Sequence, residues 1–342
     1  MVLFEIPSGY FADKFGYRLS MILSSIAGTL GFFIYWAIPS YLGFAIGEII
    51  LALGAGFMSG ARDALLYDTL AHFKQTALYT KWQGRQMTIG TFSEATAAIA
   101  AGMVASLSSV STVLLVQWLV ILASVPMAFA LRDMRPVKPQ QSSTLSKILH
   151  GSFIENATLR WLTLYAGVIS ASTLTMVWFV QPYWQLLEID VLYFGYLWAG
   201  FNIIVGLGSL VAHKVEQWMR FRTLFIAFAL SVPLLYLGAA YINTLYVSLL
   251  VVAGFWLLRG ISTPIIQDYV QRECKDGERA TVLSVSALTS RLIFSIFSPF
   301  LGWIGDIWSL ETALMASGAV FGTLSLIAIL GLLATWRAPR AA

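Results

Sequence analysis

The sequence predicts an all-α membrane protein with about eleven transmembrane helices, the first of them partial. Hydrophobic residues make up 58% of the 342 residues and charged residues only 11%, whereas a soluble domain has about 25% charged residues. Apolar runs long enough to cross a bilayer recur along the whole chain. Lysine and arginine fall almost entirely into every second connection between these runs, as expected when one side of a membrane protein faces the cytoplasm.

The first apolar piece, residues 2–12, is too short to cross a bilayer, since a spanning helix needs about 20 residues. Ten full spans are predicted after it, at residues 18–38, 41–66, 86–108, 110–131, 161–185, 191–212, 222–241, 244–267, 281–303 and 312–335. The short piece places Met1 near mid-bilayer, where a free α-amino group is costly. We therefore expect about 40–50 residues upstream, enough for one and a half spans. The alternative is a true start at Met1, with the first piece covered by neighbouring helices.

All but three of the 21 lysine and arginine residues lie in one set of connections. This set contains Lys14, Arg18, Lys74, Lys81, Arg85, Arg132, Arg135, Lys138, Lys147, Arg160, Lys214, Arg220, Arg222, Arg272, Lys275, Arg279, Arg337 and Arg340. The alternate connections contain no lysine or arginine. By the positive-inside rule the basic connections and the C-terminus are cytoplasmic, and we expect an integral protein of a bacterial inner (plasma) membrane.

The longest connection, rich in proline, glutamine and serine, is the predicted domain boundary. The expected organisation is an N-terminal helix bundle at 1–135, a cytoplasmic connecting loop at 136–158 and a C-terminal six-helix bundle at 159–342. The two halves also share residue types at an offset of 200, listed here as pairs: Gly54 and Gly254, Gly60 and Gly260, Asp68 and Asp268, Ala12 and Ala212, Lys14 and Lys214. Such a repeat indicates two similar bundles around a central path.

Residues 9–18 read Gly-Tyr-Phe-Ala-Asp-Lys-Phe-Gly-Tyr-Arg and contain a recognisable motif. This stretch resembles the Gly-x-Leu-Ala-Asp-Arg-x-Gly-Arg-Lys signature of the major facilitator superfamily (MFS). The matching residues are Gly9, Ala12, Asp13, Gly16 and Arg18, with Lys14 keeping a charge and Tyr17 replacing a basic residue. The resemblance implies a two-bundle MFS transporter fold that lacks the family's first helix and part of the second. It also implies that Asp13 latches the two halves on the cytoplasmic side, joined by Arg62 and Arg85. A solvated loop aspartate without a gating role is the alternative for Asp13.

Two further family patterns are incomplete in this chain. Glu48 stands where the family's fourth helix usually has an arginine, before Gly54 and Gly56. The stretch 93–102, which corresponds to the proline-containing fifth-helix signature of drug/proton antiporters, has no proline. These departures weaken any specific assignment to drug efflux.

Three arginines remain outside the basic connections, within predicted spans: Arg62, Arg259 and Arg291. Each costs at least about 2.5 kcal/mol at mid-bilayer, so each should face the protein interior and have a partner. Arg62 is nearer the cytoplasmic end, which favours simple pairing with Asp63, Asp68 or Asp13. Arg259 and Arg291 lie midway along their helices.

The predicted intramembrane acids are Glu5, Glu48 and Glu94, and all three belong to the N-terminal half, opposite Arg259 and Arg291. Such walls could serve a charged substrate or a coupled proton, because a carboxyl group removed from water can load and release protons near neutral pH. Static ion pairing is the alternative. Glu48, Glu94, Arg259, Arg291 and the amides Gln181 and Asn202 are the candidate substrate and coupling residues, since a buried amide needs partners.

The leading interpretation is a secondary active transporter of a small molecule by alternating access, with proton coupling as a hypothesis. No GxxxxGK[ST] loop for nucleotide binding is present. A truncated, non-transporting membrane protein and a membrane-embedded enzyme are the alternatives. The latter is disfavoured because H-E-x-x-H is absent and His72, His150 and His213 fall in predicted connections. The single Cys274 excludes an internal disulfide. We expect a monomer in the lipid bilayer without cofactor or nucleic-acid partner.

Overall fold

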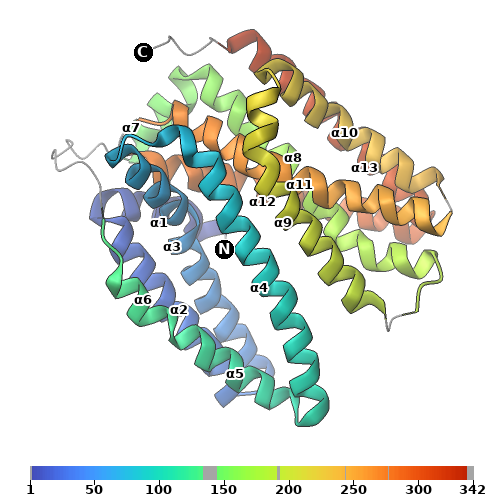
Figure 1. The fold of residues 1–342 in the computed structure, drawn as a ribbon, viewed down its shortest axis with the longest axis horizontal. Coiled ribbons are helices and arrows are strands. Elements are labelled where there is room, and N and C mark those ends of the chain that lie inside the picture. Colours follow the sequence, from blue (N-terminus) through green and yellow to red (C-terminus); the bar gives the residue numbers. More distant parts are fainter. Residues whose placement is uncertain (1, 134–144, 191–192, 243, 276, 337–342) are drawn as a thin grey trace. The chain divides into compact units, whose positions relative to one another are not determined.

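Every regular element of the described chain is a helix, as predicted (Figure 1). The computed structural model describes residues 2–133, 145–190, 193–242, 244–275 and 277–336, so residues 136–144 of the predicted connecting loop 136–158 lie outside the described residues. The rest of that loop is mostly helical, in α7, η2 and the start of α8. The helices are α1 (Val2–Phe15), α2 (Tyr17–Ala37), α3 (Tyr41–His72), η1 (Thr76–Leu78), α4 (Tyr79–Leu107), α5 (Val110–Leu122), α6 (Ser124–Ala130), α7 (Leu145–Leu149), η2 (His150–Glu155), α8 (Ala157–Leu186), α9 (Phe194–Trp218), α10 (Phe221–Tyr241), α11 (Leu245–Glu273), α12 (Arg279–Ile307) and α13 (Leu310–Thr335).

Within the described residues, 9 helices are long and apolar enough to cross a membrane. They correspond to nine of the ten predicted full spans and comprise α2, α3, α8, α9, α10, α11, α12, α13 and the α5–α6 pair. The remaining predicted span lies in α4, which has 29 residues but a more polar sequence. Polar side chains such as Thr88, Ser93 and Glu94 interrupt its apolar run. In the structure the start of α4 is buried, whereas most of its described side chains from Ile89 onward are exposed.

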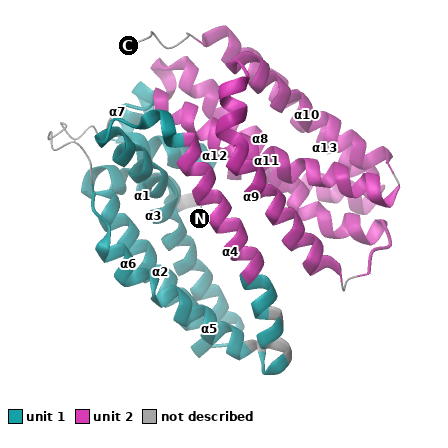
Figure 2. Ribbon diagram, viewed as in Figure 1, with its two compact units in different colours: residues 1–79, 97–152, 274–288 teal, residues 80–96, 153–273, 289–342 magenta. Residues whose placement is uncertain are grey.

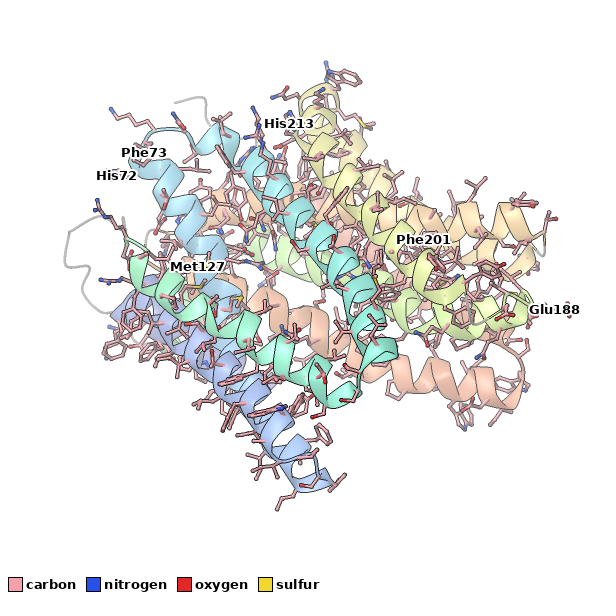
Figure 3. All side chains as sticks on the ribbon, turned by 60° about the horizontal axis from the view of Figure 1, so that its bottom comes forward. His72, Phe73, Met127, Glu188, Phe201 and His213 are labelled. Carbon is pink, nitrogen blue, oxygen red and sulfur yellow. The ribbon has the colours of Figure 1, made fainter. Side chains whose placement is uncertain are left out.

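Several helices extend one or two turns beyond their predicted spans. Thus α3 continues to His72 and α11 to Glu273, while α4 begins at Tyr79. A formed helix propagates through polar residues at little cost, whereas hydropathy marks only the part that is apolar. As a result His72 lies at the end of α3 and His213 in the last turns of α9 (Figure 3), not in connections as predicted.

The predicted span 110–131 is interrupted at Ala123, between α5 and α6. Pro126 is the cause that the sequence offers, since proline has no N–H to donate and its ring crowds the carbonyl four residues earlier. That carbonyl belongs to Leu122, the last residue of α5. The interruption is local, and the two pieces together still have spanning length.

The helix boundaries follow the repeat seen in the sequence. Helix α4 covers residues 79–107 and α12 covers residues 279–307, an offset of 200 at both ends. The next helix begins with the same cap in both halves: the Ser109 hydroxyl accepts a hydrogen bond from Thr112 N at 3.2 Å, and the Ser309 hydroxyl accepts one from Thr312 N at 3.2 Å. This agreement extends the repeat from residue types to local structure.

The chain forms two compact units (Figure 2). Unit 1 contains residues 1–79, 97–152 and 274–288, and unit 2 contains residues 80–96, 153–273 and 289–342. Helices α4 and α12 therefore contribute to both units. The division into bundles at 1–135 and 159–342 stays a prediction.

In unit 1, α3 packs along both α1 and α2, and α2 also packs against α5 and α6 (Figure 1). In unit 2, α9 packs along α11, and α13 packs along α8 and α10. Two buried tyrosines connect α8 to α10 in unit 2: Tyr165 Oη donates to Phe225 O and Tyr236 Oη donates to Ser172 O, each at 2.7 Å. Each bond satisfies a polar atom that would otherwise be buried without a partner.

Candidate functional site

The signature stretch forms the sharp turn between α1 and α2. Gly16 has φ 114°, a backbone conformation that side chains disfavour, and this explains the glycine at that position. Its N–H donates to Ala12 O at 2.9 Å, while Ala12 itself is fully buried. The first turn of α2 is capped from the end of the N-terminal half, because Tyr17 N donates to Asp133 Oδ2 at 2.9 Å.

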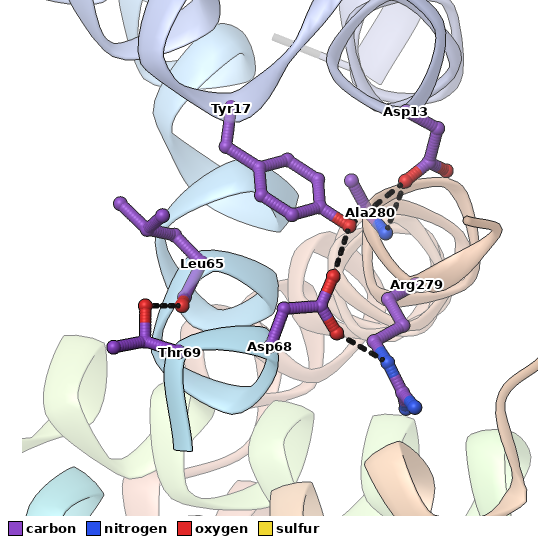
Figure 4. Close-up of polar contacts among 7 residues, drawn as sticks. All are labelled: Asp13, Tyr17, Leu65, Asp68, Thr69, Arg279 and Ala280. Atoms are coloured by element: carbon purple, nitrogen blue, oxygen red, sulfur yellow. Dashed lines mark hydrogen bonds and ion pairs between the residues drawn. The ribbon is translucent and has the colours of Figure 1, made fainter. Parts of the chain in front are cut away.

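Asp13 lies at the N-terminus of α12 (Figure 4). Its Oδ1 accepts from Ala280 N at 3.0 Å. Its Oδ2 accepts from Thr281 N at 2.8 Å and from the Thr281 hydroxyl at 2.6 Å. The first N–H groups of a helix have no partner within the helix and carry partial positive charge, so a carboxylate there satisfies them. Asp13 therefore binds α12 within unit 1.

Burial raises the pKa of Asp13 from 3.8 to about 7, even though the hydrogen bonds from Thr281 and Ala280 lower it. Nearby negative charge on Asp68 raises it further. The carboxyl group therefore changes charge near neutral pH in this arrangement.

A buried ion pair lies beside Asp13 (Figure 4). Arg279 Nε donates to Asp68 Oδ1 at 2.8 Å, and both side chains are only 7% exposed. Tyr17 Oη donates to the other carboxylate oxygen of Asp68 at 3.1 Å. The Arg279 guanidinium also lies 4.1 Å from the centroid of the Tyr67 ring, a favourable cation–π distance. We call Asp13, Asp68, Arg279, Ala280 and Thr281 the α12 cluster.

Small residues allow α1 and α3 to approach α12 beside this cluster. A Cβ added at Gly9 would lie 2.7 Å from Ala280 O, and one added at Gly60 would overlap the same oxygen. Ser284 lies one turn further along α12, against both glycines. Glycine is therefore required at position 9 because a larger residue would collide with α12.

The basic residues of the predicted latch have separate partners. Arg18 donates to Phe129 O at 2.7 Å, and Arg62 Nε donates to Asp63 at 2.9 Å, one of the pairings expected for it. Arg85 belongs to unit 2, where its guanidinium lies 4.9 Å from the Trp82 ring centroid. Whether Arg62 and Arg85 act with Asp13 stays a prediction.

The sequence did not identify Arg279, the cation of the α12 cluster. The predicted span begins at residue 281 and so leaves Arg279 in a connection, whereas α12 starts at Arg279. The recurrence of Asp68 as Asp268 is a sequence signal for this cluster. Asp68 contacts Arg279 at the start of α12, and Asp268 contacts Thr80 at the start of α4.

Asp268 is the counterpart in unit 2. Its Oδ2 accepts from the Thr80 hydroxyl at 2.9 Å, in the first turn of α4, and it pairs with Arg272. Arg272 also donates to Glu216 Oε1 at 2.9 Å. The neighbouring Gln267 accepts from Gln83 of α4. In unit 2, polar contacts therefore attach the beginning of α4 to the end of α11.

Two of the predicted intramembrane charges are brought together in unit 2. Glu94 of α4 is the acid whose charge acts on Arg259 of α11. Within the described part of the chain, neither side chain makes a hydrogen bond or an ion pair of 4.0 Å or less. Arg291 of α12 lies in the same unit and is partly buried. The proximity of Glu94 and Arg259 makes this pair the centre of the candidate substrate site.

The other candidates lie apart from this pair in different settings. Glu48 accepts a hydrogen bond from Tyr35 Oη at 2.6 Å within unit 1. The Asn202 amide donates to Trp198 O of its own helix at 3.1 Å, and Gln181 is exposed. Glu5, the third predicted intramembrane acid, is fully buried and accepts a hydrogen bond from the Ser59 hydroxyl. Among the described residues, no group of three or more histidine, cysteine or acidic side chains could hold a metal ion.

Comparisons with known proteins agree with this arrangement. No curated protein matches the chain at the level required for significance. Among solved structures the fold is similar to the human organic anion transporter MFSD10, with TM-score 0.77 and 14% identity over 97% of this chain and 80% of that one. It is also similar to a variant of the E. coli fucose:proton symporter FucP, with TM-score 0.70 and 17% identity over 96% of this chain and 87% of that one. A third similar structure is a bacterial homologue of the iron transporter ferroportin in an outward-facing state, with TM-score 0.73 and 15% identity over 98% of this chain and 87% of that one.

These low identities support the fold alone. A family model described as the Major Facilitator Superfamily, in contrast, matches residues 1–296. This match covers most of the chain, including the signature turn and the residues of both α4 and α11. The chain therefore belongs to the Major Facilitator Superfamily and is an integral membrane protein of that transporter family.

Proposed function

We propose that this protein is a secondary active transporter that moves a small molecule by alternating access, with a proton coupled through Glu94. The observation that carries the proposal is the pair of opposite charges, Glu94 and Arg259, in the middle of helices α4 and α11 of unit 2. A charge at mid-membrane costs at least about 2.5 kcal/mol on insertion scales. Charges kept there without hydrogen bonds are available to bind a substrate or a proton.

The α12 cluster supports the second half of this proposal. Alternating access requires contacts that form in one state and break in the other. Asp13 accepts hydrogen bonds from two backbone N–H groups and one hydroxyl of α12. Water can satisfy these α12 groups once the contact opens. We propose that the α12 cluster is the closed form of a cytoplasmic gate, with the C-terminus on the same side. The N-terminal and C-terminal bundles, 1–135 and 159–342, would be the moving parts.

The test begins with a thermal-shift screen of the full chain in detergent against neutral sugars, organic anions, amino acids and organic cations. Compounds that raise the Tm are then tested for accumulation in proteoliposomes with an inward proton gradient. The proposal predicts that at least one compound accumulates above its external concentration and that a protonophore abolishes this accumulation.

Glu94→Gln tests the coupling role, with Glu188→Gln as the matched control. Glu188 is an exposed residue in the connection after α8, so the control removes one carboxylate far from the middle of the spans. Accumulation driven by the proton gradient should disappear in Glu94→Gln and remain in the control. Gradient-driven accumulation by Glu94→Gln at the wild-type level removes Glu94 from the mechanism. A complete panel without accumulation by wild type contradicts the transport proposal.

A further inference from the structure

The middle of unit 2 carries more positive than negative charge. Arg259 is the central residue of α11 (Leu245–Glu273), and Glu94 is one residue past the centre of α4 (Tyr79–Leu107). Arg291 is two residues before the centre of α12 (Arg279–Ile307). Two arginines thus share this depth with one glutamate, among the described residues of the unit.

The guanidinium of Arg259 is only loosely neutralised. Glu94 acts on it electrostatically but not through an ion pair of 4.0 Å or less, and no described group forms a hydrogen bond with it. An arginine has five N–H donors, arranged in a fork that matches a carboxylate. Arg259 is partly buried and Glu94 is exposed. A partly buried fork with no acceptor is therefore suited to an incoming anion.

The remaining charged groups of the helices packed around this pair lie near the helix ends. On α4 the nearest is Arg85, nine residues from Glu94, and on α11 it is Asp268, nine residues from Arg259. Nine helical residues correspond to about 13 Å along the axis. The others lie within the first or last two turns of their helices: Lys81 on α4, Arg160 on α8, His213, Lys214 and Glu216 on α9, Arg222 on α10, and Arg272 and Glu273 on α11. Apart from Arg291 of α12, the local charge balance at this depth is therefore set by Glu94 and Arg259.

We propose that the substrate is an organic anion whose carboxylate binds Arg259 in competition with Glu94, and that Glu94 takes up one proton as it is displaced. This inference rests on the proposed transport function and names its substrate class. A carboxylate can approach the guanidinium in a bidentate geometry, which Glu94 does not achieve in this structure.

The charges balance over the cycle. Before binding, Arg259 is positive and Glu94 negative. After binding, the substrate carboxylate neutralises Arg259, and a proton from water binds a carboxylate oxygen of Glu94. No covalent bond other than this O–H forms or breaks. Release of the anion and the proton on the other side restores the starting state, so one proton accompanies each carboxylate.

The binding test uses pairs of compounds that differ in charge alone. Acetate, lactate, benzoate and gluconate are each compared with the corresponding neutral amide, by thermal shift on the full chain at pH 5.5, 6.5 and 7.5. At least one carboxylate should stabilise wild type more than its amide does. Because one proton is taken up on binding, its Kd should rise by up to about tenfold per pH unit where Glu94 is ionised.

Four variants locate the effect. Arg259→Gln should lose the preference for carboxylate over amide, and Arg222→Gln, an exposed arginine at the start of α10, should retain it. If Arg259→Gln does not fold, Arg259→Lys keeps the charge without the fork and should bind the carboxylate at least tenfold more weakly. Glu94→Gln should bind the carboxylate as tightly as wild type or more tightly, with no dependence on pH.

The outcomes separate this inference from the proposed function. Absence of carboxylate preference in wild type, or an equal preference in Arg259→Gln, overturns the inference. Transport of a neutral or cationic compound without carboxylate binding overturns it and leaves the transport proposal in place. If a carboxylate binds in an Arg259-dependent way but does not accumulate in proteoliposomes, the anion site is supported and only the transport proposal is contradicted.

Discussion

Replacing Arg279 with glutamine is expected to destabilise the protein by about 3–5 kcal/mol, because it leaves Asp68 buried without its cation. The cost is high because both side chains are only 7% exposed and their atoms are 2.8 Å apart. Tyr17 Oη, 3.1 Å from Asp68, still donates a hydrogen bond but cannot supply the charge. The variant also loses the cation–π contact between the Arg279 guanidinium and the Tyr67 ring, 4.1 Å from the ring centroid, which further destabilises the protein.

The assay is thermal unfolding of the full chain in detergent, followed by intrinsic fluorescence. At about 2 °C per kcal/mol for a chain of this size, Arg279→Gln should lower the Tm by about 6–10 °C. Arg18→Gln is the matched control, since Arg18 is exposed and donates one hydrogen bond, to Phe129 O. An exposed interaction of this kind is worth about 0–1 kcal/mol, so the control should lower the Tm by about 2 °C or less.

The double variant Asp68→Asn/Arg279→Gln tests the pairing itself. Removing both charges of a buried pair often costs little, whereas removing one leaves the other unpaired. The double variant should therefore be more stable than Arg279→Gln alone. Equal Tm values for Arg279→Gln and Arg18→Gln, or additive losses in the double variant, would refute the reasoning.

Three further predictions follow from local geometry. Gly16→Ala should cost about 1–3 kcal/mol in thermal unfolding, because Gly16 has φ 114°, whereas Gly90→Ala, at an open helical position, should be neutral or stabilising. Ser309→Ala should cost about 1 kcal/mol by removing the cap of α13, and Ser309→Thr should retain most of the stability. Burial raises the pKa of Asp13 to about 7 in the α12 cluster, so the protonated form favours the contact. This stabilisation is present below pH 3.8 and is lost as pH rises through about 7. A cysteine at Ser284 in a Cys274→Ser background should therefore react faster with a maleimide as pH rises, relative to the same reporter with Asp13→Asn; equal pH profiles would exclude this role of Asp13.

The helical architecture could be predicted from the sequence because the bilayer imposes a length and a composition on each span. Hydropathy located the cores of α2, α8 and α10 to within a few residues. It could not locate where helices end in water, since backbone hydrogen bonding continues through polar residues at little cost. The same limit hid Arg279, the first residue of α12, among the loop residues.

The candidate site could be predicted only in part. Charges within the spans were visible because each is costly in a membrane, and Glu94 and Arg259 are indeed neighbours. The partner of a given charge depends on the rotation of each helix, which a run of apolar residues does not specify. Two walls of opposite charge were expected from the N-terminal and C-terminal halves. The observed pair joins Glu94 of the N-terminal half to Arg259 of the C-terminal half, and both residues belong to unit 2.

The two halves resemble each other weakly in sequence, yet α4 and α12 have matching boundaries, and one pair of close helix contacts shows how both can hold. In unit 1, Gly9 of α1 packs against Ser284 of α12. In unit 2, at an offset of 200, Ser209 of α9 packs against Gly84 of α4. The glycine and the serine have exchanged places between the two contacts. Close approach of two helices requires that both contacting residues be small and that the serine hydroxyl find an acceptor. It does not matter which of the two helices carries the glycine. Ser209 Oγ shows this directly, because it donates to Gly84 O at 2.9 Å across the contact. When only the combined size of two contacting residues has to be kept, the sequence identity between the two halves can be lost at each position. The packing of each helix against its neighbour is retained.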